Sequence, residues 1–211
     1  MSQPPICPRC AGALRPPDLW SSEWRCEVHG DVAPFHVAAR VCVAALQHVL
    51  AQAIVPVWLP QPMLPGWTVS GLGHAGDERS GGRATVVAIS GPSPLGGPAD
   101  LLLIAEEPGV GLGCFLAGLP GPDPGIAADE VPDVKVQAAG HPTPLWATPA
   151  PADRAAFAGE AKGLWLWVLV WPANASLIFM ERVELHDLRD LDPLDVLFGA
   201  PTPRLRVEEP S

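Results

Sequence analysis

Hydrophobic residues follow two different spacings along this chain. Between residues 37 and 54 they recur every three or four positions, as in Val37, Val41, Ala45 and Val49, while Arg40 lies off that stripe. This spacing is typical of one face of an α-helix, so the pattern predicts a single helix over Val37–Ile54 that Pro56 ends. A proline-rich, extended segment follows up to Gly66.

From Trp67 onward the apolar residues form short runs separated by glycine and proline, which indicates strands joined by turns. Short connections between neighbouring strands favour antiparallel pairing. The pattern therefore predicts an α+β protein with a small N-terminal ribbon, one helix and then a mainly antiparallel β-sheet domain. The predicted strands are Trp67–Leu72, Ala84–Ser90, Leu101–Glu106, Cys114–Ala117, Val134–Ala139, Leu145–Thr148, Leu164–Trp171 and Ser176–Met180.

One stretch has the length and apolar character of a membrane span. Residues Gly163–Met180 carry no charged side chain, but Pro172-Ala173-Asn174 inside the stretch is typical of a turn. The residues on either side are rich in strand formers. We therefore expect a buried β-hairpin here, and no insertion into a membrane.

These patterns divide the chain into four parts. We expect a zinc ribbon over residues 1–33, the helix and a proline-rich linker over 34–66, the sheet domain over 67–199, and a disordered acidic tail over 200–211. The chain has 211 residues, of which 48% are hydrophobic, and this is ample for one core.

The ribbon is predicted from two short motifs. Cys7-Pro8-Arg9-Cys10 lies near the start of the chain, and Cys26-Glu27-Val28-His29 follows about fifteen residues later. Each motif can aim two soft ligands at one point, and thiolate and imidazole are ligands that tetrahedral Zn²⁺ prefers. The sequence therefore predicts one structural zinc ion on Cys7, Cys10, Cys26 and His29, with His36 as a less well spaced substitute for His29.

A disulfide or a redox-active Cys-x-x-Cys pair is the alternative interpretation of the first motif. A redox pair normally opens a helix after a strand, and Pro8 with the turn at Gly12 argues against that context. Four protein ligands would also leave no open position for the water molecule that catalytic zinc needs. Cys42 and Cys114 stand in apolar runs, where we expect inert, buried thiols.

Charge and composition limit the classes of partner and the cellular compartment that we expect for this protein. The net charge is −10, and the ribbon itself is slightly acidic, so neutralisation of nucleic-acid phosphates is not favoured. The sequence begins without the pattern of a secretory signal, and cysteines held reduced on zinc fit the cytoplasm. We expect a cytoplasmic protein with a protein partner. The many alanines, prolines and glycines are typical of a GC-rich genome.

Four polar loops hold the remaining candidate site residues. The loop Gly76–Arg83 offers Asp77, Arg79 and Arg83, which together could hold an anion or could simply pair with each other. The loop Glu106–Gly113 is rich in glycine, but it lacks the Gly-Lys-Ser/Thr of a phosphate loop and we predict no helix after it. Loops around Asp153-Arg154 and around Asp187-Leu188-Arg189-Asp190 hold arginine beside carboxylate, an arrangement that predicts salt bridges.

No catalytic motif emerges from these loops. The sequence contains neither a Gly-x-Ser-x-Gly elbow nor His-Glu-x-x-His, and His74, His141 and His186 lie far apart along the chain. The leading hypothesis is a non-enzymatic binding or regulatory module. The alternative is an enzyme acting on an anionic small molecule, with Arg79 and Arg83 binding the anion and Glu106 or Asp187 acting as base. We expect Asp77, Arg79 and Arg83 to lie near Glu106 or Asp187.

Several short segments between the ribbon and Asp190 form a specific combination, and they are Pro56–Trp58, Ala75–Thr85, Gly91–Gly97, Pro142–Trp146, Gly163–Trp167 and Asp187–Asp190. With the two ligand motifs, these segments resemble an uncharacterised actinobacterial family whose members carry a Cys-x-x-Cys and Cys-x-x-His head. The resemblance covers most of the chain. The family is a domain of unknown function, so the resemblance implies the zinc-bound head and a bacterial cytoplasm but no reaction.

Overall fold

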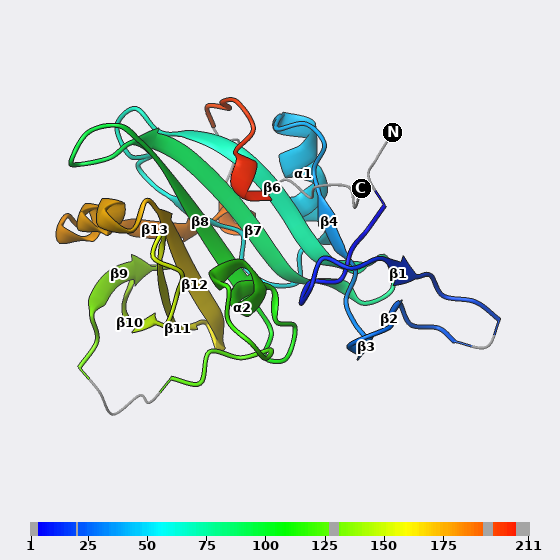
Figure 1. The fold of residues 1–211 in the computed structure, drawn as a ribbon. Coiled ribbons are helices and arrows are strands. Elements are labelled where there is room, and N and C mark those ends of the chain that lie inside the picture. Colours follow the sequence, from blue (N-terminus) through cyan, green and yellow to red (C-terminus); the bar gives the residue numbers. More distant parts are fainter. Residues whose placement is uncertain (1–3, 20, 127–130, 192–195, 206–211) are drawn as a thin grey trace.

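The fold is an α+β arrangement built on one large, curved and mostly antiparallel sheet (Figure 1). The computed structural model describes residues 4–19, 21–126, 131–191 and 196–205. Within them, ten strands follow the order β4-β6-β7-β8-β12-β11-β10-β9-β13-β5, and β13 runs parallel only to β9. These strands are β4 (Phe35–Val37), β5 (Trp58–Pro60), β6 (Thr68–Asp77), β7 (Gly81–Pro92), β8 (Pro98–Glu106), β9 (Val134–Ala138), β10 (His141–Thr148), β11 (Ala155–Ala161), β12 (Leu164–Trp171) and β13 (Glu184–Asp187).

A separate three-stranded sheet forms the N-terminal ribbon, and short helices cover the large sheet. The ribbon strands are β1 (Leu14–Arg15), β2 (Arg25–Cys26) and β3 (Gly30–Asp31). The helices are α1 (Val43–Gln52) and α2 (Leu112–Ala117), and the 3₁₀ segments are η1 (Ala173–Met180), η2 (Leu188–Asp190) and η3 (Pro203–Leu205). No helix of the described chain is both long and apolar enough to cross a bilayer.

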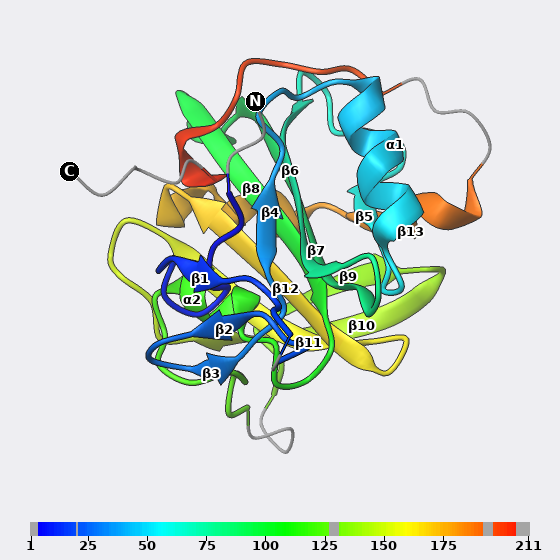
Figure 2. The ribbon, with the colours of Figure 1, turned by 90° about the vertical axis from the view of Figure 1, so that its right-hand side faces the viewer.

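The central strands β7, β8 and β12 are buried on both faces, which explains their continuous apolar runs. Leu101 and Leu103 of β8 point into the core beneath α1 and η1, whereas Leu102 and Ile104 point into a second core on the opposite face. That second core also contains α2, Ile6 of the ribbon segment, and Leu205. Figure 2 shows α1 on one side of the sheet and the ribbon with α2 on the other.

Most predicted strands are confirmed, since Ala84–Ser90, Leu101–Glu106 and Leu145–Thr148 lie inside β7, β8 and β10, and Leu164–Trp171 is β12. Two predictions of strands are wrong. Cys114–Ala117 belongs to helix α2, and Ser176–Met180 belongs to the 3₁₀ segment η1, so the predicted hairpin does not form. Strand β12 pairs instead with β11 and β8.

Helix α2 also overturns the prediction that no helix follows the glycine-rich loop after Glu106. Gly111 and Gly118 flank the helix with φ angles of +85° and +81°, a left-handed conformation that only glycine adopts without strain, and they set its two ends. A four-residue apolar run has no period by which a helix can be told from a strand.

Two boundaries differ from the predicted ones. The helix predicted over Val37–Ile54 is shorter, because residues 35–37 form β4 at the sheet edge and α1 begins only at Val43. The prediction of disorder from residue 200 is wrong for residues 200–205, because Thr202 donates its backbone N–H to the carbonyl of Ser70 at 2.8 Å and Leu205 is buried. Residues 206–211 lie outside the described residues.

Candidate metal centre

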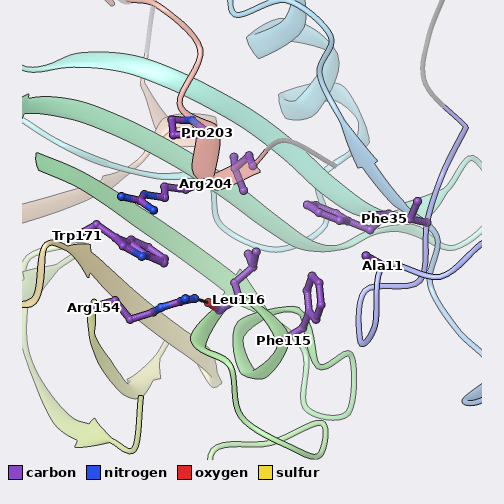
Figure 3. Close-up of a pocket in the computed structure, with 10 residues that line it drawn as sticks. Ala11, Phe35, Phe115, Leu116, Arg154, Trp171, Pro203 and Arg204 are labelled. Atoms are coloured by element: carbon purple, nitrogen blue, oxygen red, sulfur yellow. Dashed lines mark hydrogen bonds between the residues drawn. The ribbon is translucent and has the colours of Figure 1, made fainter. Parts of the chain in front are cut away.

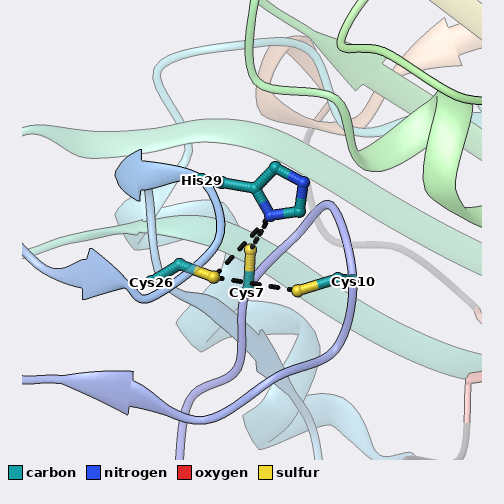
Figure 4. Close-up of side chains that lie close together, drawn as sticks. All are labelled: Cys7, Cys10, Cys26 and His29. Carbon is teal, nitrogen blue, oxygen red and sulfur yellow. Dashed lines mark hydrogen bonds between the residues drawn. The ribbon is translucent and has the colours of Figure 1, made fainter.

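The four predicted metal ligands meet at one point (Figure 4). One ligand atom from each of Cys7, Cys10, Cys26 and His29 lies within 4.8 Å of the others. The Sγ atoms of Cys7 and Cys26 are 3.5 and 3.6 Å from Nδ1 of His29, and Cys10 Sγ is 3.8 Å from Cys26 Sγ. Three sulfurs and one imidazole nitrogen at these separations match the donor set of a tetrahedral structural site.

Local backbone geometry brings the two motifs into this arrangement. The backbone N–H of Ala11 donates to the carbonyl of Cys7, and the N–H of Cys7 donates to Gly12, both at 2.9 Å, so the first motif folds into a tight knuckle. Ala11 adopts a φ of +56° to allow this turn. The N–H of Arg9 points at Cys7 Sγ at 3.5 Å, as backbone groups do around sulfur ligands.

The thiols differ in how readily they lose a proton. Burial raises the pKa of Cys7. Burial acts in the same direction on Cys26, but hydrogen bonds from the backbone N–H groups of Val28 and His29 outweigh it and lower the pKa of that thiol. Cys26 therefore forms a thiolate more readily than Cys7, and metal binding to the Cys7 thiol releases its proton. All five cysteines are free of disulfides.

The ribbon is fastened to the large sheet at three places. Ile6 exchanges backbone hydrogen bonds with Phe35 of β4 at 3.0 and 2.8 Å. The guanidinium of Arg9 donates to the carbonyl oxygens of Gly109 and Val110, just before α2. Arg79 donates to the carbonyl of Ser22 at 2.8 Å. The knuckle thus sits on the sheet as a fixed element.

The first polar loop forms the turn between β6 and β7. Asp77 accepts hydrogen bonds from the backbone N–H groups of Arg79 and Ser80, at 3.1 and 2.9 Å. Arg83 pairs with Glu107 at 2.6 Å, and not with Glu106. Asp77 and Arg83 line a small cleft of about 130 Å³ beside the ribbon.

Glu106 binds the start of α2. Its side chain is fully buried and accepts hydrogen bonds from the N–H groups of Leu112 and Gly113, at 2.8 and 3.2 Å, at the start of α2. Burial raises the pKa of this carboxyl to about 7, although both N–H groups and the nearby Trp167 favour the charged form. The Trp167 indole nitrogen is buried without a hydrogen-bond partner of normal geometry among the described residues.

Asp187 is the last residue of β13, the strand that pairs with β5, and Arg189 follows it in η2. Arg189 and Lys162 bind the buried Asp187 carboxylate at 2.7 and 3.1 Å, as the salt-bridge interpretation predicted. These hydrogen bonds and one from the N–H of Val57 outweigh burial and lower the pKa of Asp187 to about 2. The six polar candidates therefore have different immediate partners: Asp77 binds backbone N–H groups of its own turn, Arg79 binds Ser22, Arg83 binds Glu107, Glu106 binds the start of α2, and Asp187 binds Arg189.

Sequence reasoning missed a cavity that lies elsewhere. Arg154, Trp171 and Arg204 share one wall of a cavity of about 750 Å³ (Figure 3). Of these three residues, only Arg154 had been singled out from the sequence, as part of the polar loop at Asp153-Arg154. Arg204 lies in the segment predicted to be disordered, so nothing in the local pattern indicated that it meets Trp171.

The chain belongs to a family of unknown function, DUF6758, whose model matches residues 1–205. Comparisons with curated proteins and with solved structures gave no match.

Proposed function

We propose that this protein is a non-enzymatic binding or regulatory module whose metal-bound ribbon docks a protein partner. The observation that carries the proposal is the closed set of four protein ligands on a rigidly attached knuckle. A set with no open position serves to hold a surface in shape.

The surface that the knuckle holds is suited to a protein partner. Val28, between the ligands Cys26 and His29, is 78% exposed, and Leu19 is 98% exposed. Val28 borders a shallow groove of about 600 Å³ that also includes Arg15, Arg25 and Glu27. Apolar side chains surrounded by charges of both signs are typical of a protein interface, whereas nucleic acid would require a basic surface.

The alternative of an enzyme acting on an anionic small molecule has less support from the same residues. Its proposed bases are Glu106, which is buried against α2, and Asp187, which is neutralised by Arg189 and Lys162. Arg79 donates to the carbonyl of Ser22 and Arg83 pairs with Glu107, so in the described structure the arginines have partners other than the two proposed bases.

The identity of the ion and the setting are parts of the same proposal. Three thiolates and one imidazole are the donor set of structural Zn²⁺, so we propose zinc. Five free cysteines and the resemblance noted above support the reducing cytoplasm of an actinobacterium.

Cross-linking in the native host tests the docking surface directly. Val28→Asp places a charge on the groove without touching a metal ligand, and we expect it to abolish recovery of the partner while the metal content is unchanged. Met180→Asp is the matched control, because Met180 is an equally exposed apolar residue on η1 (84%). Equal recovery of the same proteins by both variants would contradict the proposal, as would an absence of any specific partner of the parent protein.

A further inference from the structure

The large cavity lies where six segments of the chain meet (Figure 3). It is lined by the ribbon segment at Ile6 and Ala11, by β4, by α2, by the loop before β11, by the end of β12, and by η3. Its volume of about 750 Å³ is within the range of small-molecule sites, which are mostly apolar with a few convergent polar groups.

The cavity is divided into an apolar part and a cationic part. Phe35, Phe115 and Ala11 lie together at one end in Figure 3, and Trp171 lies at the other with Arg154 and Arg204 on either side of it. The two guanidinium carbons are 4.8 and 5.2 Å from the Trp171 ring centroid. Stacking on an aromatic ring holds a guanidinium in a fixed orientation.

The two arginines differ in how many of their guanidinium N–H groups already donate a hydrogen bond within the protein. Arg154 donates to both carboxylate oxygens of Asp153 and to the carbonyl of Leu116, so it is already committed. The guanidinium of Arg204 donates through Nε alone, to Asp100 at 3.3 Å. Within the described part of the chain, its two terminal nitrogens have no hydrogen-bond partner.

A guanidinium that is oriented by stacking, unpaired at its terminal nitrogens and bordered by apolar side chains is suited to bidentate recognition of a carboxylate. We propose that this cavity binds a small monocarboxylate with an apolar aryl or alkyl group, the carboxylate on Arg204 and the apolar group against Ile6, Phe35 and Leu116. Asp100 and Asp153 already balance much of the positive charge, and this restricts the ligand to a single negative charge. The site is separate from the Val28 groove, so the proposal goes beyond docking by the ribbon.

Calorimetry with matched probes tests both halves of the ligand. We expect saturable binding of 4-phenylbutanoate and octanoate to the whole protein, weakened by added salt. The neutral 4-phenylbutanamide tests the charge and acetate tests the apolar group, and each should bind about tenfold more weakly or worse. Equal affinity for the acid and the amide would overturn the proposal, and so would an absence of saturable binding of both carboxylates at millimolar concentration.

Substitution of Arg204 localises the binding. Arg204→Gln removes the charge and should weaken 4-phenylbutanoate by about tenfold or more, whereas Arg204→Lys keeps the charge and should retain part of the affinity. Arg182→Gln is the control, because Arg182 pairs with Glu184 outside the cavity and is 73% exposed. Melting temperature and metal content verify that each variant is folded. Unchanged affinity in folded Arg204→Gln would show that the carboxylate binds elsewhere and refute the proposal, without bearing on the Val28 surface.

Discussion

At the scale of single residues, three histidines pack together between α1 and the sheet edge. His36 of β4 stacks on His74 of β6 with ring centroids 5.0 Å apart, and His48 of α1 meets His74 edge-on at 5.5 Å. Burial, and then the proximity of His36 and His48, lower the pKa of His74 to about 4. A proton is therefore bound more tightly by the unfolded chain than by the folded one.

This difference predicts acid sensitivity. The free energy of unfolding should fall as the pH is lowered from the ordinary histidine pKa of 6.5 towards 4, by about 2–3 kcal/mol from this residue. His74→Gln should remove that part of the slope in urea unfolding measured between about pH 7 and about pH 4.5. His141→Gln, at an exposed histidine, should keep it; if both variants retain the parent slope, the His74 prediction is wrong.

Glu106 predicts the opposite trend. Its pKa is about 7 in the folded protein against an ordinary value of 4.5, so the folded protein holds the proton more tightly and the free energy of unfolding falls as the pH rises through this range. Glutamine does not titrate in this range, so Glu106→Gln should remove about 2–3 kcal/mol of that decline. The fold should be kept, because the amide oxygen can still accept hydrogen bonds from the N–H groups at the start of α2. Glu107→Gln, at the adjacent and partly exposed residue, serves as the control in the same titration. A decline that persists in Glu106→Gln would refute the assignment.

At the scale of elements, a strand or helix could be predicted where its own residues show a pattern, and could not where contacts with other elements fix it. The strand Leu164–Trp171 was predictable because it is an unbroken run of apolar, strand-forming residues, and from Leu166 onward they are buried on both faces. Helix α2 was not, because its apolar run is too short to show a period and the contacts that fix it come from other elements: Glu106 at the end of β8 accepts its first N–H groups, and Trp167 of β12 packs against it. Strand β11 was missed because its alanines and glycine lack the side chains that mark a strand.

The contact between α2 and β12 yields a prediction for Gly113. A Cβ atom there would lie 2.2 Å from Nε1 of Trp167, so a side chain can be accommodated only if the helix or the indole moves. We expect Gly113→Ala to lower the free energy of unfolding by about 1–3 kcal/mol, measured by urea denaturation. In a Trp167→Phe background the same substitution should cost less, because the five-membered ring of the indole is gone. Equal costs in both backgrounds would show that the clash is not with Trp167.

At the scale of the whole molecule, the ribbon and the sheet share a core. The ligand set was predictable from spacing alone, since each Cys-x-x-ligand motif is local. The attachment of the ribbon to the sheet could not be predicted from spacing, because it depends on Ile6 and Phe35 packing with Leu205 from the opposite end of the chain. The predicted boundary at residue 33 therefore falls between two residues that pack together, and the cavity beside them is built from segments up to 200 residues apart in sequence, a placement no local pattern encodes.

The shared core determines what loss of the metal should do. We expect one ion per chain by elemental analysis, and Cys26→Ser should lower that content to near zero because three ligands remain. Without the ion, the three short ribbon strands have too little core to stay folded. Hydrogen exchange should accelerate in β1–β3 and at the backbone N–H of Phe35, which donates to Ile6 at 2.8 Å.

The central strands β7, β8 and β12 should keep their protection in Cys26→Ser, because both of their faces remain covered by α1, η1 and α2. Cys42→Ser is the matched control, since Cys42 lies outside the ligand set at the start of α1 and its loss should leave both metal content and exchange unchanged. Full protection of β1–β3 in metal-free protein would show that the ribbon folds without an ion. Loss of protection throughout β7, β8 and β12 would show instead that the knuckle is needed to close the outer core, so that ribbon and sheet unfold as one unit.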